Sequence, residues 1–208
     1  YKFFDQKKIS LFKKIIITSL ISYVFIIYSN VNRPDAFLYH LPYSKILNDD
    51  KIIFGLTNLH SRFGHISIYQ YISSIFVSKI FSYNGVLIPI SLVPSFFFIY
   101  CYKRFKSDFK NKDLRINSFI TFIILIISFY SFSRYSGWGN DAQAHIYYFL
   151  SIIYFLDHNS NRNDLDIFNK LMITSLFTFL IKPFYIISFL MPFVFFLIKR
   201  DKIIIVKS

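Results

Sequence analysis

The chain of 208 residues is poor in charged residues and has a single cysteine. Charged residues make up 17% of the chain, against about 25% in an average soluble domain, which argues against an ordinary soluble domain. With Cys101 as its one thiol, the chain forms neither an internal disulfide nor a cysteine-based zinc site. Glutamate is absent, so the 11 acidic residues are all aspartates, and 24 Lys and Arg residues give a formal net charge of +13.

Hydrophobic residues make up 54% of the chain and aromatic residues 22%, and the apolar residues form long blocks. This pattern is atypical of disordered chains and of nucleic-acid-binding tails. In a chain with such blocks, the positive charge indicates cytoplasmic loops rich in Lys and Arg. The lipid bilayer is therefore the first predicted partner, and no nucleic-acid partner is expected.

Long windows without Asp, Lys or Arg predict helices in a bilayer. These windows cover residues 15–32, 80–102, 116–133, 142–156 and 183–198. A spanning helix needs roughly 17 to 25 residues at about 1.5 Å each, and several windows reach that length. The first window lacks a small-residue cleavage signature and is followed by further windows, so it predicts an anchor rather than a removed signal peptide.

The positive-inside rule separates two topologies. If residues 66–82 lie along the membrane surface, 17 Lys and Arg residues are cytoplasmic and 7 are external. If the same residues cross the membrane, 8 are cytoplasmic and 16 are external. The rule favours the first topology, with a cytoplasmic N-terminus. The segment also mixes several serines and Lys79 with Ile and Phe, as an interfacial helix does.

The predicted fold class is all-α, a polytopic transmembrane helical bundle with a long external loop that carries amphipathic helices. The external loop is 33–84 with an interfacial helix at 66–82, and the spans are about 15–31, 84–102, 116–133, 142–156, 171–181 and 184–198. The last two spans separate at Lys182 and Pro183, because proline disfavours helix at the preceding residue. Residues 1–208 are predicted to be a single integral membrane domain. We expect this domain to be a fragment of a larger protein, because the chain starts at Tyr1 instead of Met.

In this topology the unusual polar side chains gather on the external side. Asp35 is a candidate general base that takes a proton from an acceptor hydroxyl. Tyr39 and His40 follow one helical turn later, so they are candidate substrate-binding residues. The structural alternative is that Asp35 caps a helix that starts at Ala36. The two roles are compatible.

Asp141 is the second candidate catalytic acid, and N-capping of the following apolar helix is its structural alternative. His145 lies four residues later on the same helical face, where the pair could bind a cation or orient a phosphate group. One Asp and one His fall far short of a full coordination set, so a divalent cation is the weaker expectation. Asn140, directly before Asp141, is a further candidate substrate-binding residue.

Three external cations are candidate partners for a phosphate leaving group: Arg62, Arg134 and Lys182. Preorganised positive charge near developing negative charge lowers a reaction barrier. His60 lies beside Arg62 and is a candidate contact as well. The alternative is that the arginines contact lipid headgroups and that the histidine is solvated. Lys182 is the most informative of these residues, because an ammonium between two apolar runs is costly unless it reaches water, headgroups or a counter-ion.

Together these residues resemble a known family. R-P-D-A-x2-Y-H-L-P-Y after the first span, R-x5-N-D at the next outer turn and L-I-K-P two helices later are similar to the N-terminal half of GT-C-type glycosyltransferases. That superfamily includes protein O-mannosyltransferases, aminoarabinose transferases and oligosaccharyltransferases. In their motifs and spacing, these residues are most similar to uncharacterised bacterial GT-C-like membrane proteins that have an Asp-x3-Tyr-His start and a Gly-Asn-Asp turn. The resemblance covers roughly residues 30 to 200.

The resemblance implies a bacterial inner-membrane enzyme of the cell envelope. Such an enzyme takes a sugar from a polyprenyl-phosphate donor and passes it to a glycan, lipid or protein acceptor on the external face. Asp35 and Asp141 match the family's two acidic positions, and Lys182 matches a lysine that approaches the lipid phosphate. The second turn reads Asn-Asp instead of the family's Asp-x-Asp. Two alternatives stay open: a transporter or flippase for a lipid-linked glycan, and a non-catalytic membrane assembly subunit.

Overall fold

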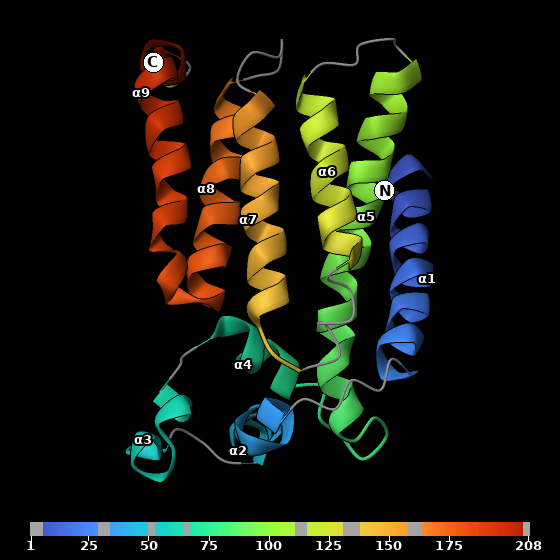
Figure 1. Cartoon of the computed structure of the whole chain (residues 1–208), viewed down its shortest axis with the longest axis vertical. Coiled ribbons are helices and arrows are strands. Elements are labelled where there is room, and N and C mark those ends of the chain that lie inside the picture. Colours follow the sequence, from blue (N-terminus) through green and yellow to red (C-terminus); the bar gives the residue numbers. More distant parts are fainter. Residues whose placement is uncertain are drawn as a thin grey trace, which may run out of the picture.

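The computed structural model describes residues 6–28, 34–49, 53–64, 67–110, 116–130, 138–157 and 164–205. Its long helices stand side by side, and each runs antiparallel to the one before it (Figure 1). They are α1 (Gln6–Tyr28), α5 (Leu87–Lys110), α6 (Ile116–Tyr130), α7 (Asp141–Leu156), α8 (Asp164–Ile181) and α9 (Leu190–Ile205). The described residues form no strand, only an isolated bridge between Ser78 and Ser82. The predicted all-α class is confirmed.

Three helical stretches are long and apolar enough to cross a membrane, among the residues described. They are Ile9–Tyr28, Tyr83–Lys110 and Pro183–Arg200. The predicted spans 116–133 and 142–156 correspond to α6 and α7, which have 15 and 16 residues. A fourth apolar helix, α6, is thus shorter than a full crossing, and the chain is consistent with an integral membrane protein.

The polarity of α1 is that of a helix packed in lipid. Its large apolar side chains point outward: Leu20 is 60% exposed and Phe25 is 65% exposed. Its serine face points inward, where the Ser22 and Ser95 hydroxyl oxygens lie 3.0 Å apart in the contact with α5. Membrane helices commonly pack through small and polar residues, whereas a soluble bundle buries its large apolar residues.

Helices α7, α8 and α9 form the other side of the bundle. The Ser151 hydroxyl of α7 donates a hydrogen bond to Thr174 of α8 at 2.7 Å. Helix α8 starts at Asp164, earlier than the predicted span 171–181, because Asp164 and Asp166 suit the positive end of a helix dipole. After α8 the chain is extended at Lys182, and Pro183 opens the 3-10 helix η6 (Pro183–Phe189). The predicted break is confirmed.

Short helices collect at one end of the bundle, which is the lower end in Figure 1. They are η1 (Ala36–His40), α2 (Leu41–Asp49), α3 (Leu56–Leu59), η2 (Ser61–Gly64), α4 (Ile68–Ser74) and η3 (Tyr83–Val86). The start of α7 and the turn from α8 into η6 lie at the same end (Figure 1). We call it the lower end, and the opposite end, where α5 and α7 finish and α6 and α8 begin, the upper end.

The interfacial helix predicted at 66–82 is wrong beyond Ser74, where α4 ends. The backbone N–H of Phe76 donates to the Ser73 carbonyl at 3.1 Å, which closes the last turn tightly. The Phe76 carbonyl then lies so near Gly85 that a Cβ there would be 1.9 Å from its oxygen. The chain therefore folds back on itself after α4, and Gly85 permits the close approach.

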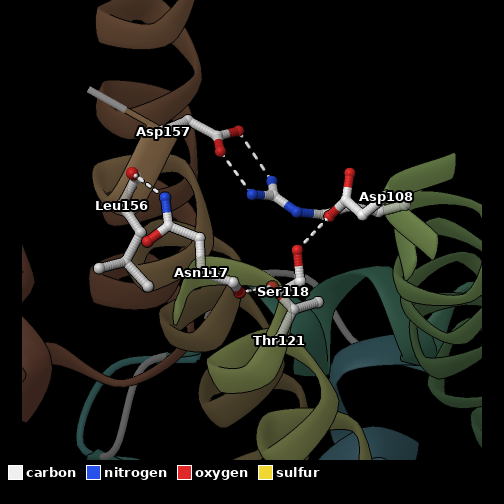
Figure 2. A network of polar contacts seen from close by, with 7 residues as sticks. Asp108, Asn117, Ser118, Thr121, Leu156 and Asp157 are labelled. Carbon is white, nitrogen blue, oxygen red and sulfur yellow. Dashed lines mark hydrogen bonds and ion pairs between the residues drawn. The ribbon is translucent and has the colours of Figure 1, made fainter. Parts of the chain in front are cut away.

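A buried polar network joins α5, α6 and α7 at the upper end (Figure 2). Arg104 of α5 donates two hydrogen bonds to the Asp157 carboxylate, at 2.8 and 2.5 Å. The Asn117 amide of α6 donates to the Leu156 carbonyl at 2.6 Å. The Arg104 and Asp157 side chains are only 9% and 5% exposed. This network fixes the upper ends of three helices relative to one another.

Candidate functional site

Residues from three separate segments meet at the lower end. Asp35 directly precedes η1, Asp141 is the first residue of α7, and Lys182 directly follows α8. These segments meet because the chain passes up α7 and down α8, which returns it to the same end (Figure 1). We call the group formed by Asp35, Tyr39, His40, Arg62, Asp141 and Lys182 the candidate site.

Asp141 and Lys182 form an ion pair across the two helices. The Lys182 Nζ donates to the Asp141 Oδ1 at 2.7 Å. The two side chains are 40% and 68% exposed, so the pair adds about 0 to 1 kcal/mol to stability and separates easily. Asn140, not Asp141, occupies the N-cap position of α7, and its side chain makes no capping hydrogen bond. Lys182 thus has the counter-ion that its position required.

Tyr39 is the centre of the group. Its hydroxyl makes a hydrogen bond with Asp35, which lies four residues earlier in the chain, directly before η1. Burial raises the pKa of the Tyr39 phenol, and the Asp35 charge, the hydrogen bond with Asp35 and the Asp141 charge raise it further, while Arg62 lowers it. Tyr39 is therefore a neutral hydrogen-bond donor. The Asp35 side chain makes no capping bond to η1, so the capping role is not seen.

His40 is neutral at pH 7. Burial lowers the pKa of its imidazole, an effect that Arg62 adds to and that Asp141 and Asp35 oppose. Its Nδ1 lies 3.4 Å from the amide nitrogen of Gln70 in α4. Because an amide nitrogen only donates, this contact makes Nδ1 the acceptor and places the ring proton on Nε2.

His60 and Arg62 reach the group through the Tyr39 ring. The rings of Tyr39 and His60 stack with centroids 5.9 Å apart, and the Arg62 guanidinium lies 5.5 Å from the Tyr39 centroid. The backbone N–H of Arg62 donates to His60 Nδ1 at 3.1 Å. A cation over an aromatic face is attracted by the ring quadrupole, so both residues hold the segment 56–64 against η1.

The remaining predicted residues lie at the edge of the group or outside it. His145 packs edge-on against Tyr185, with centroids 5.8 Å apart, and does not join Asp141 in any cluster suited to a metal. Among the described residues no group of three or more His, Cys, Asp or Glu side chains could hold a metal ion. Asn140 contributes its backbone carbonyl, which accepts a bond from the Ala144 N–H at 3.1 Å. Arg134 lies outside the described residues.

Two residues of the lower end are not among the predicted ones. Gln70 belongs to the segment predicted to be an interfacial helix, and in the structure it is 6% exposed and contacts His40. Trp138 has a left-handed backbone with φ 52°, which is uncommon for a residue with a side chain. The sequence signal for Gln70 was its spacing of three residues from Ser67 and from Ser73, which places the three polar side chains on one face of a helix. Trp138 could be picked from the sequence as an aromatic residue of the second outer loop, but its left-handed backbone could not.

Taken together, the group holds two carboxylates, two cations, a phenol and a neutral imidazole. This set can accept a proton at Asp35, donate hydrogen bonds from Tyr39 and His40, and neutralise an anion with Arg62 and Lys182. Such groups suit a substrate that carries both hydroxyls and a phosphate.

The comparisons with known proteins identify a family and no activity. One protein family matches residues 1–207, and its description is Domain of unknown function (DUF8201). No curated protein and no solved structure matches the chain.

Proposed function

We propose that this chain, which belongs to the DUF8201 family, is a membrane glycosyltransferase that moves a sugar from a polyprenyl-phosphate donor to an acceptor on the external face. The observation that carries the proposal is the meeting of Asp35, Tyr39, Asp141 and Lys182 at one end of an apolar helical bundle. The likeness of the R-P-D-A-x2-Y-H and L-I-K-P motifs to GT-C-type enzymes gives the reaction class.

The position of the group suits a donor that is dissolved in the bilayer. The α8–η6 turn carries Lys182 between apolar helices, and the next residues Phe184, Ile186 and Ile187 are 83%, 64% and 58% exposed. A polyprenyl phosphate has its tail among such side chains and its phosphate at headgroup depth. Lys182 can therefore meet the phosphate without leaving its place in the fold.

The distribution of charge supports the external face. The candidate site lies at the lower end, whereas the basic residues Lys103, Lys106 and Lys110 belong to the C-terminal part of α5, and α5 finishes at the upper end (Figure 1). Cytoplasmic ends of membrane helices are rich in Lys and Arg. We therefore assign the upper end to the cytoplasm of a bacterial inner membrane, together with the N-terminus, and the lower end to the exterior.

The proposed reaction is a displacement at the anomeric carbon of the sugar. The acceptor oxygen forms a bond to that carbon while the bond from the carbon to the phosphate oxygen breaks. Asp35 takes the proton of the acceptor hydroxyl, and Lys182 and Arg62 stabilise the charge of the departing polyprenyl phosphate. Asp141 holds Lys182 before the donor binds, since their pair is exposed and exchanges easily. Asp141 thus serves as a counter-ion in this scheme.

The proposal is tested by substituting Asp35 and a matched acid. Asp49 is an exposed aspartate at the end of α2, and its carboxylate accepts a bond from the neighbouring Asn48 amide at 3.2 Å. Membranes that contain the full chain are given polyprenyl phosphates with a radiolabelled glucose, galactose, mannose or arabinose. Movement of the label from the polyprenyl phosphate into a different product, separated by chromatography, measures the transfer. We expect Asp35→Asn to lower the rate by about 100-fold or more, as removal of a general base does, and Asp49→Asn to leave it unchanged.

Transfer by Asp35→Asn at the wild-type rate, with normal abundance in the membrane, contradicts the role of Asp35. A non-catalytic assembly subunit would show no transfer with any donor and would tolerate loss of Asp35, Asp141 and Lys182 together. A flippase would move labelled lipid between leaflets without releasing the sugar.

A further inference from the structure

Helix α4 buries its polar residues, together with Tyr69, and exposes Tyr71 and the residue that follows the helix, Ile75. Ser67, Gln70 and Ser73 are 3%, 6% and 2% exposed, whereas Tyr71 and Ile75 are 45% and 73% exposed. Ser67 occupies the N-cap position, and spacings of three residues place the polar side chains on one side of the helix. An interfacial helix would point this face to water, so the buried orientation requires another explanation.

Three atoms on this face have no hydrogen-bond partner. They are the Ser67 Oγ, the Gln70 Oε1 and the Ser73 Oγ, which are half of the six buried side-chain atoms that lack a partner in the described part of the chain. The neighbouring Ser74 is equally buried, but its hydroxyl donates to the Tyr71 carbonyl at 2.8 Å. A buried polar atom without a partner destabilises a fold, so three on one short helix point to a partner that completes them.

This face is joined to the candidate site through one hydrogen bond. The Gln70 amide nitrogen lies 3.4 Å from His40 Nδ1, and the ring of His40 lies 4.2 Å from that of Tyr39. His40 is half-buried, so it stands between the enclosed Gln70 and the exposed part of the site. Helix α4 also packs against α2, α5, α8 and η3, and α8 ends directly before Lys182 of the site.

We infer that the buried face of α4, formed by Ser67, Gln70 and Ser73, is a subsite for the hydroxyl groups of the transferred sugar. The inference rests on the proposed function, and it says where the sugar of the polyprenyl-phosphate donor binds. Gln70 Oε1 only accepts hydrogen bonds, while the serine hydroxyls both donate and accept. A sugar ring matches this set, because each of its neighbouring hydroxyls also donates and accepts. A phosphate has little to donate to Gln70 Oε1, so it belongs at Lys182 and Arg62.

The test compares variants on the same helix. Ser73→Ala removes an unpaired hydroxyl, and Gln70→Met removes the unpaired Oε1 together with the amide nitrogen that contacts His40. Ser74→Ala is the matched control because its hydroxyl is already paired within α4. The full chain in lipid nanodiscs is titrated with undecaprenyl phosphate and with undecaprenyl phosphates that carry glucose, galactose or mannose. The ratio of the two dissociation constants, bare lipid over sugar lipid, measures binding of the sugar alone.

We expect the wild-type protein to prefer at least one sugar lipid over the bare lipid. Ser73→Ala and Gln70→Met each reduce that preference by about 3- to 10-fold, the value of one neutral hydrogen bond, and Ser74→Ala leaves it unchanged. Binding of bare undecaprenyl phosphate is the same in all these proteins and falls in Lys182→Met.

Two results overturn the subsite. If the wild-type protein shows no sugar preference, or if Ser73→Ala and Gln70→Met retain it, the three atoms contact internal water only. In either case, Lys182-dependent binding of the bare lipid leaves the proposed function standing while the subsite falls. If neither the bare lipid nor any sugar lipid binds, the proposed function and the subsite fall together.

Discussion

Asp157→Asn is expected to destabilise the bundle more than loss of any other single ion pair in the described residues. The Arg104 and Asp157 side chains are 9% and 5% exposed. The two terminal guanidinium nitrogens, Nη1 and Nη2, each donate a hydrogen bond to one oxygen of the Asp157 carboxylate. Without the carboxylate charge, the guanidinium stays buried and uncompensated. Breaking a buried pair from one side costs about 3 to 5 kcal/mol. We therefore expect the free energy of unfolding to fall by about that amount.

The assay is reversible unfolding of the full chain in mixed detergent micelles, with the variants combined in a double-mutant cycle. Replacing both partners, as in Arg104→Met with Asp157→Leu, leaves no buried charge and is expected to recover most of the lost stability. Lys170 and Asp166 supply the control, because this i,i+4 pair of α8 is 42% and 53% exposed. Asp166→Asn should cost less than about 1 kcal/mol. Equal losses for Asp157→Asn and Asp166→Asn, or a double variant as unstable as Asp157→Asn, would refute the reasoning.

Three smaller effects follow from other contacts. Lys182→Met separates the ion pair with Asp141, so it should weaken donor binding while changing the free energy of unfolding by less than about 1 kcal/mol, measured by titration and by unfolding in micelles. The pKa of His40 is lower in the folded chain than its ordinary 6.5, so the unfolded chain binds a proton more readily as the pH falls. The free energy of unfolding should therefore be highest above about pH 6.5 and decline as the pH falls below that value. Unfolding measured at about pH 5 to 8 should show this dependence in the wild-type chain and its loss in His40→Asn. The Ser22 and Ser95 hydroxyls couple by about 0.6 kcal/mol in a double-alanine cycle, and a value near zero would remove their hydrogen bond from the packing of α1.

The helices themselves were predictable because the apolar windows are longer than any soluble core needs. The break at Lys182 was predictable as well, since Pro183 restricts the residue before it. The start of α8 was not, because Asp164 and Asp166 read as loop residues until their place at a helix N-terminus is seen. Local chain stiffness and dipole effects thus decide the helix ends.

The candidate site was predictable in its members but not in its pairings. Asp141 and Lys182 are both unusual residues at apolar helix ends, so each could be picked from the sequence alone. Their contact depends on how α7 and α8 pack, and it turns Asp141 into a counter-ion. The burial of Gln70 could not be predicted, because the mix of polar and apolar residues in a helix does not say which face packs against the protein. The metal expectation for Asp141 and His145 found no third ligand among the described residues.

Sidedness is the central claim, because the donor phosphate, the base and the cations act together only if the lower end faces the exterior. Ser61 of η2 and Ser107 of α5 are both exposed and lie at opposite ends, and Cys101 is buried, so single Ser→Cys variants can be labelled with little background. Right-side-out membrane vesicles are treated with a membrane-impermeant maleimide before and after permeabilisation. We predict that Ser61→Cys reacts in sealed vesicles and that Ser107→Cys reacts only after permeabilisation. Labelling of Ser107→Cys in sealed vesicles, with Ser61→Cys protected, would contradict the account.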